Sequence, residues 1–375
     1  MKILVKEDIE RMRIKMSKEN FVNIVGYQFE RIHNGVIKWI LDWKNKSINE
    51  DYKYEIIKRI YFESNNNIDF TKEDIADIVC KTEYPFGRQL RIDLLIIIKL
   101  KNGEERFLIL ETKVDSIPEE YQLKRIYQIF NEKHNKNNPI FLLFLFGTSN
   151  VCEKPQNLHS FAVIDIDKII RIFDINKKIN SNIFNNWLQE LKEEKNRMNN
   201  IEYYLKNSHS FLDEDYWNDK GYRTWLPLYY CIYNKMREKS KKSDKWLIYS
   251  GNNNAVMNWK EWIAGDKLSN NDITQLLGER KKDVEFYFEF NNNLFYLKMH
   301  LRKANSLSTS EIEAIKTQIE KIWNNQNIKK GKKASRARGG EWISLYRVDF
   351  DFKNDDLSHI INEAEKIIEE MSKRL

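Results

Sequence analysis

Two carboxylates and a lysine lie in two apolar segments that a strand hairpin would bring together. Asp93 interrupts the β-branched segment "LRIDLLIIIKL", and Glu111 and Lys113 lie at the end of "RFLILETKV". Carboxylate oxygens bind Mg²⁺ or Mn²⁺, and a lysine beside such an ion can orient a water or stabilise charge on a phosphate. These residue types therefore fit metal-assisted hydrolysis of a phosphodiester.

The segment between the two apolar stretches, "KNGEE" at 101–105, has the Asn-Gly pair typical of a tight turn between antiparallel strands. Strand side chains alternate between faces, so Glu111 and Lys113 share one face and Thr112 points to the other. Taken alone, Glu111 and Lys113 could be an exposed ion pair worth about 0–1 kcal/mol. The position of Asp93 favours the interpretation as a functional site, because an unpaired carboxylate in an apolar strand costs free energy of folding.

Apolar periodicity predicts the elements that position this hairpin. They are a helix or helix pair over 18–44 with a break near 33–35, a helix over 51–62, a helical turn leading into an extended segment over 71–79, a helix over 119–135, a central strand within 139–148, and a strand and helix within 161–173. This order predicts an α/β fold with a mixed sheet flanked by helices.

The second half predicts a separate α+β domain for substrate binding or regulation. We expect a division into 1–180 and 181–375, with the boundary placed between about 175 and 210. The elements expected there are a long helix over 183–206, a helix over 224–239, a strand over 245–250, a hairpin over 283–301, helices over 309–324 and 355–373, and a strand over 341–352.

Asp93, a gap of seventeen residues, and then Glu111-Thr112-Lys113 resemble the motif of the PD-(D/E)XK nuclease superfamily. The resemblance covers roughly residues 20–170 and implies the restriction-endonuclease-like fold. It further implies that Asp93, Glu111 and the backbone carbonyl of Thr112 bind Mg²⁺ or Mn²⁺, and that Lys113 positions the attacking water. The sequence departs from the pattern at Ile92, where a proline often precedes the aspartate.

Two helical residues extend the resemblance. Glu30, in "ERIH", corresponds to the acidic residue on the first helix that completes the metal site in many members. Gln122 lies in "EEYQLKRIYQ", which resembles the Q-L-x-R-x-Y region of a bacterial and phage-associated branch, and it would steady the site or contact a phosphate. Either residue could instead be an ordinary polar residue on a helix surface.

A basic segment in the second half is the candidate contact for nucleic acid. It is "KKGKKASRARGG", and its cations are Lys329, Lys330, Lys332, Lys333, Arg336 and Arg338. Such a segment suits phosphate contacts, whose strength falls with salt, but it could also be a solvated loop in a lysine-rich chain. Five aromatic residues could stack on bases, although helical spacing more often indicates a core: Trp217, Tyr222, Trp225, Tyr229 and Tyr230.

Composition sets broader limits on function. The chain carries 63 Lys and Arg against 56 Asp and Glu, a net charge of +7 that is compatible with a polyanionic partner or with codon bias. The three cysteines are widely separated, the start lacks the apolar core of a signal peptide, and no apolar run reaches the roughly 20 residues that span a bilayer. We therefore expect a cytoplasmic protein without a membrane segment.

The expected activity is that of a metal-dependent nuclease, acting on DNA in preference to RNA, in bacterial restriction or phage defence. Two alternatives remain open at this point. The fold could bind nucleic acid without cleaving it, or the second domain could sense a ligand or partner that activates the nuclease. The sequence also leaves open whether the chain forms a homo-oligomer.

Overall fold

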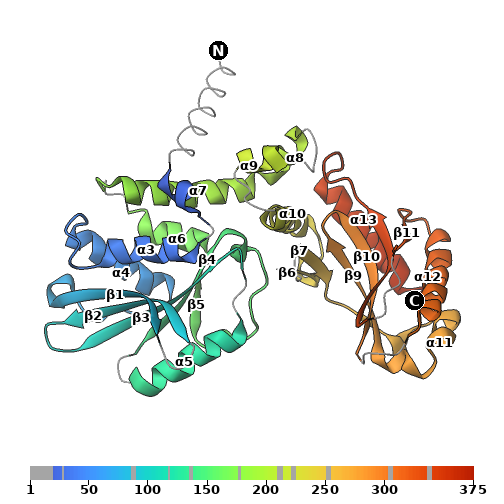
Figure 1. Ribbon diagram of the computed structural model, residues 1–375, viewed down its shortest axis with the longest axis horizontal. Coiled ribbons are helices and arrows are strands. Elements are labelled where there is room, and N and C mark those ends of the chain that lie inside the picture. The colour runs from blue at the N-terminus through green and yellow to red at the C-terminus, as the bar shows by residue number, and fades with distance from the viewer. Residues whose placement is uncertain are drawn as a thin grey trace, which may run out of the picture. The chain divides into compact units, whose positions relative to one another are not determined.

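The computed structural model describes residues 20–27, 29–85, 90–116, 119–134, 138–175, 179–208, 214–220, 225–250, 255–302, 307–335 and 340–375. The chain forms two compact units (Figure 1). The first comprises Met1–Asn150 and Lys154–Met198, and the second comprises Val151–Glu153 and Asn199–Leu375. Among the described helices, none combines the length and the apolar character needed to cross a membrane.

The first unit is built on a mixed five-stranded sheet in the order β1-β2-β3-β4-β5. Its strands are β1 (Ile75–Pro85), β2 (Arg91–Leu100), β3 (Glu105–Val114), β4 (Ile140–Phe146) and β5 (Phe161–Ile164). The first three are antiparallel, whereas β4 runs parallel to both β3 and β5. The predicted hairpin is confirmed, and Gly103 in its turn has a φ of 86°, a value that favours glycine.

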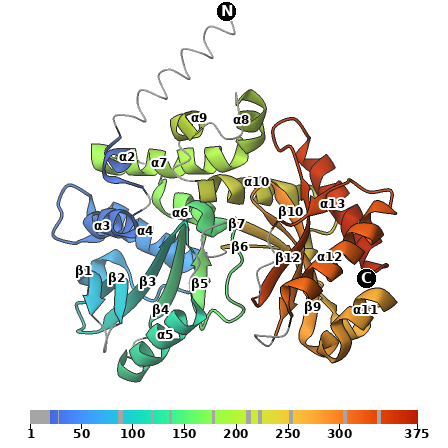
Figure 2. The ribbon, with the colours of Figure 1, turned by 45° about the vertical axis from the view of Figure 1, so that its right-hand side comes forward.

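Helices cover both faces of this sheet (Figure 2). The described helices of this unit are α2 (Phe21–Val25), α3 (Glu30–Leu41), α4 (Glu50–Glu63), α5 (Glu120–His134), α6 (Ile166–Phe173) and α7 (Asn182–Asn199). Leu142 and Phe144 of β4 share one core with α3, α4, α6 and α7, whereas Leu143 shares the other core with α5. The prediction that this wholly apolar strand is covered on both faces is therefore confirmed.

The first helical region differs from the prediction at its break. Helix α2 ends before Gly26, whose φ is 103°, and α3 then runs unbroken through residues 33–35. The prediction of a break near 33–35 is wrong, because His33 and Asn34 are buried within α3 and make hydrogen bonds there. The break lies instead at the glycine that adopts the left-handed region.

Helix α7 belongs to the first unit, although the sequence placed it in the second. Its Phe184, Trp187 and Leu191 lie in the core beside α3, α4 and α6. The predicted long helix over 183–206 is in fact α7 followed by α8 (Ile201–Asn207), which belongs to the second unit. The division between the units therefore falls at residues 198 and 199.

The second unit is built on an antiparallel sheet in the order β11-β12-β10-β9-β7-β6, with β8 paired to β9. Its strands are β6 (Trp246–Ser250), β7 (Ala255–Trp259), β8 (Ile263–Ala264), β9 (Val284–Asn291), β10 (Leu294–Leu301), β11 (Lys332–Lys333) and β12 (Trp342–Asp349). Its further helices are α9 (Glu214–Asp219), α10 (Trp225–Lys239), α11 (Asn271–Leu277), α12 (Thr309–Asn324) and α13 (Leu357–Ser372). The sequence had not indicated β7, β8, β11, α9 or α11.

Strand alternation gives the second sheet two different faces. Phe290 lies on the face toward α10, where its ring is 6.1 Å from that of Tyr233. On the other face, Lys298 forms an ion pair at 2.8 Å with the buried Glu289, and the ring of Trp262 stacks on Tyr287 at 4.5 Å. The second unit is thus an α+β structure with its own core.

Candidate active site

The hairpin brings Asp93 and Glu111 to adjacent strands. In its register Leu95 pairs with Ile109 and Leu94 with Leu110, so Asp93 and Glu111 come next along the two strands. The backbone N–H of Thr112 donates to Asp93 Oδ2 at 2.8 Å. The Asp93 carboxylate therefore accepts a backbone hydrogen bond from β3 just beyond the last backbone pair of the two strands.

Glu111 is the centre of the cluster, and its side chain is fully buried. Its Oε1 accepts hydrogen bonds from Lys113 Nζ and from Gln122 Nε2, each at 2.6 Å. Gln122 reaches it from α5 because that helix packs its Leu123 and Ile126 against the sheet. Among the described residues, Glu111 Oε2 has no hydrogen-bond partner although it is buried.

Burial and like charge raise the pKa of both carboxyls. The pKa of Glu111 is raised to about 8, first by burial and then by the charge of Asp93. Burial also raises the pKa of Asp93 to about 6, although the Thr112 N–H and Lys113 favour its charged form. Burial alone would lower the pKa of Lys113, but the surrounding carboxylates raise it. With both carboxyls ionised the site would hold excess negative charge out of water, and a bound divalent cation would neutralise that charge.

Glu30, at the start of α3, borders this cluster. Its Oε1 accepts a hydrogen bond from Ser116 Oγ at 3.5 Å, and its charge contributes to the raised pKa of both Asp93 and Glu111. Within the described part of the chain, however, no three or more His, Cys, Asp or Glu side chains are grouped closely enough to hold a metal. The role of Glu30 as a third metal ligand stays a prediction.

Thr112 points its side chain away from Glu111, as strand alternation predicted. Its Oγ1 donates to Asn34 Oδ1 of α3 at 2.7 Å, and both side chains are buried. This contact fixes Thr112, the residue whose backbone N–H binds Asp93 and whose backbone carbonyl is the predicted metal ligand. Asn34 was missed in the sequence, where a buried polar residue in an apolar helical stripe was the available signal.

His33 is the inward-facing polar residue of the "ERIH" segment, and it has a structural role. Its Nε2–H donates to the Tyr27 carbonyl at 2.8 Å, and its Nδ1 accepts from Trp187 Nε1 at 3.2 Å. The ring also stacks on Phe146 with centroids 3.9 Å apart. These contacts fix α3 against β4 and α7, and they use both ring nitrogens.

The chain after Lys113 is held by a short turn. Asp115 has a φ of 53°, and its Oδ1 accepts from the backbone N–H of Thr148 at 2.8 Å. The Ser149 hydroxyl accepts from the Ser116 N–H at 2.9 Å and donates to the Ser116 carbonyl at 2.6 Å. This turn fixes the end of β3, and with it the position of Lys113.

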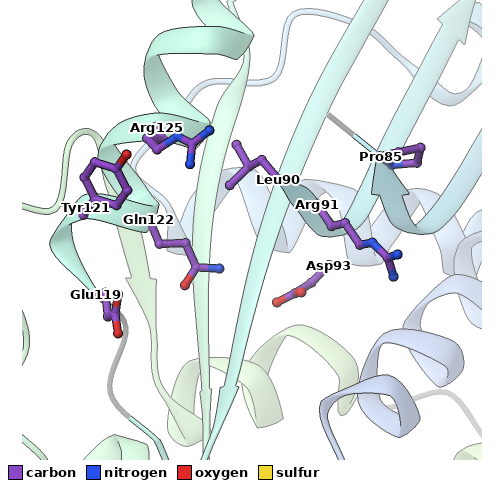
Figure 3. Close-up of a pocket in the computed structure, with 8 residues that line it drawn as sticks. All are labelled: Pro85, Leu90, Arg91, Asp93, Glu119, Tyr121, Gln122 and Arg125. Atoms are coloured by element: carbon purple, nitrogen blue, oxygen red, sulfur yellow. The ribbon is translucent and has the colours of Figure 1, made fainter. Parts of the chain in front are cut away.

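A pocket of about 780 Å³ opens beside Asp93 (Figure 3). The side chains of Asp93 and Gln122 extend toward one another from β2 and α5. The pocket is lined by Pro85, Leu90, Arg91, Asp93, Glu119, Tyr121, Gln122 and Arg125. The sequence had assigned no role to Tyr121, Arg91 or Arg125.

The predicted basic segment lies in the second unit, and its described lysines all have intramolecular partners. Lys330 donates to the carbonyls of residues 324 and 326 at the end of α12, and Lys333 lies 3.4 Å from Glu320. Lys329 lies 3.9 Å from Asp355, and Lys332 lies 3.2 Å from Asp349. Among Lys329, Lys332 and Lys333, Lys332 has the most exposed side chain, at 58%. Arg336 and Arg338 lie outside the described residues.

The candidate aromatic residues are core residues where their side chains are described. Trp217, Tyr229 and Tyr230 are buried, which agrees with the interpretation of helical spacing as packing. Tyr222 and the side chain of Trp225 lie outside the described part of the structure. Trp217, Tyr229 and Tyr230 therefore provide no surface for stacking bases.

The donor atoms of the site fit Mg²⁺ or Mn²⁺, which prefer oxygen ligands. Asp93, Glu111 and the Thr112 carbonyl would hold the ion. For Glu111 Oε2, which has no partner among the residues described, the ion would supply the missing partner. Comparisons with family models, with curated proteins and with solved structures give no match. The functional assignment therefore rests on the residues and their geometry.

Proposed function

We propose that this protein is a metal-dependent nuclease with a PD-(D/E)XK type of site and a restriction-endonuclease-like first unit. The observation that carries the proposal is the buried Glu111 carboxyl, which has one oxygen bound by Lys113 and Gln122 and the other without a partner in the part of the chain that the structure describes. DNA is the preferred substrate in this proposal. A role in restriction or phage defence, in the cytoplasm, follows from the resemblance alone.

Each residue of the cluster has a place in hydrolysis. When bound, Mg²⁺ would polarise the scissile phosphate and lower the pKa of a water. Lys113, held by Glu111, would orient the attacking water and stabilise negative charge on the phosphate. Gln122 keeps Glu111 oriented, and the Thr112 N–H keeps Asp93 in place. Water adds across one P–O bond, leaving a phosphate on one product end and a hydroxyl on the other.

A cleavage assay tests the proposal. Labelled single-stranded and double-stranded DNA and RNA are incubated with the full chain in Mg²⁺, in Mn²⁺ and in EDTA. We expect cleavage in Mg²⁺ or Mn²⁺ and none in EDTA. Lys113→Met should lower the cleavage rate by about 100-fold or more, because it removes both the positioning of the water and the stabilisation of charge on the phosphate. Lys124→Met, at an exposed position on α5, is the matched control and should cleave normally.

Two results would contradict the nuclease proposal. One is absence of cleavage on every substrate by a protein that is folded and binds nucleic acid, which would favour a binding protein. The other is metal-dependent cleavage that Lys113→Met and Lys124→Met retain equally, which would place the chemistry elsewhere or in a contaminant. Activity that requires an added cell extract would instead favour an effector regulated by a ligand or partner.

A further inference from the structure

The pocket beside Asp93 has chemically distinct walls. On the α5 side, the Tyr121 side chain is 66% exposed and the Arg125 guanidinium lies 5.5 Å from its ring centroid. On the opposite side, the buried Leu90 is followed by Arg91, whose side chain is 70% exposed. The pocket thus combines an exposed aromatic ring, an apolar wall and two guanidinium groups next to a proposed metal ligand.

These groups match the two parts of a nucleotide. Bases stack on exposed aromatic rings, and guanidinium groups bind phosphate oxygens, often through two hydrogen bonds. The ion pair of Arg91 with Glu83 is long, at 3.7 Å, and exposed, so a phosphate could replace the carboxylate at little cost. A volume of about 780 Å³ lies in the range of pockets that enclose small organic ligands.

We propose that this pocket binds an unpaired nucleotide adjacent to the scissile phosphate, and that the substrate is therefore single-stranded nucleic acid. This inference rests on the proposed nuclease function. A phosphate bound beside Asp93 carries a nucleoside on each side, and the pocket lined by Asp93 receives one of them. A base stacked on Tyr121 inside the pocket cannot remain stacked and paired in a duplex.

The roles within the pocket follow from the positions of its residues. Tyr121 provides the stacking surface, and Arg125 stays over the ring as a cation that also attracts the backbone. Arg91, two residues before Asp93 on the same strand, contacts a phosphate next to the one being cleaved. Tyr121 and Arg91 are thus positioning residues that select unpaired strands.

Binding in EDTA tests the pocket without cleavage. The fluorescence anisotropy of a labelled single strand and of the matching duplex is measured with the full chain and with Tyr121→Ala. We expect the single strand to bind more tightly, and Tyr121→Ala to weaken its binding by about 5- to 150-fold, the range for one stacked base, with little change for the duplex. Tyr203→Ala removes a 58% exposed tyrosine of α8 and should change neither affinity.

Arg91→Ala should weaken single-strand binding and reduce the slope of log affinity against log salt by about 0.7, the value for one phosphate on a single strand. The inference is overturned if the duplex binds as tightly as the single strand, or if Tyr121→Ala binds the single strand like the parent protein. Either result with normal metal-dependent cleavage leaves the nuclease proposal intact. If Tyr121→Ala loses single-strand binding and neither the parent protein nor the variant cleaves, the result supports nucleotide binding in this pocket and contradicts the nuclease proposal.

Discussion

Glu111 makes the metal-free protein less stable as the pH rises. Its pKa is raised from 4.5 to about 8 in the folded protein. Between these values the folded state keeps a proton that the unfolded chain has released, so the free energy of unfolding falls with increasing pH. Below 4.5 the carboxyl is protonated in both states and adds no penalty, whereas above about 8 the full penalty applies.

The size of this effect follows from the difference between the two pKa values. They differ by roughly 3.5 pH units, and each is worth about 1.4 kcal/mol, which gives an upper limit of about 5 kcal/mol. Asp93, whose pKa is raised to about 6, shares the same repulsion, so the two penalties do not simply add. We expect ionisation of Glu111 to lower the free energy of unfolding by about 2–5 kcal/mol at pH 8.

Glu111→Gln isolates this penalty, because glutamine has nearly the same shape and no charge. Urea unfolding in EDTA should show the variant about 2–5 kcal/mol more stable than the parent at pH 8, and within about 1 kcal/mol of it at pH 5. Glu132→Gln, an exposed position on α5, should change neither value by more than about 0.5 kcal/mol. Equal stability of Glu111→Gln and the parent protein at pH 8 would refute the view of Glu111 as a desolvated charge.

Five further substitutions, at four positions, test other contacts of the structure. Thr112→Val should cost about 1–3 kcal/mol in urea unfolding, because Asn34 Oδ1 stays buried without a donor, whereas Thr112→Ser should retain most of the stability. His33→Leu should cost about 2–4 kcal/mol without changing the Mg²⁺ affinity measured by calorimetry; a selective loss of Mg²⁺ binding would give His33 a metal role. Lys332→Ala should reduce the salt slope of nucleic-acid binding by about 1 if the basic segment contacts phosphate. Lys330→Ala should instead lower the stability of the protein, because Lys330 binds carbonyls at the end of α12.

The parts of the fold that were predicted correctly depend on local sequence. The "KNGEE" turn was identified because an Asn-Gly pair between two apolar strands has few alternatives to a hairpin. The all-apolar run of β4 had to be buried on both faces, since neither face could meet water. Asp93, Glu111 and Lys113 were predicted to converge for the same reason, because hairpin register and strand alternation fix which side chains are neighbours.

The parts that were missed depend on contacts between distant segments. Asn34 Oδ1 binds Thr112, which is 78 residues away, and no local pattern shows that this asparagine would find that partner from within a helix. The Asn-Gly pair at 34–35 therefore looked like a break, whereas the break lies at Gly26. Helix α7 joins the first unit through Trp187, which binds His33 across 154 residues. Tertiary contacts of this kind override local propensity.

In the proposed mechanism, Asp93 and Glu111 bind one divalent metal ion beside Lys113. The most direct measurement is anomalous diffraction from crystals of the full chain soaked in Mn²⁺. We expect one strong peak within bonding distance of Asp93, of Glu111 Oε2 and of the Thr112 carbonyl, and no peak there in Glu111→Gln crystals. A saturated crystal with manganese bound elsewhere, or with no peak between the two carboxylates, would contradict the proposed mechanism.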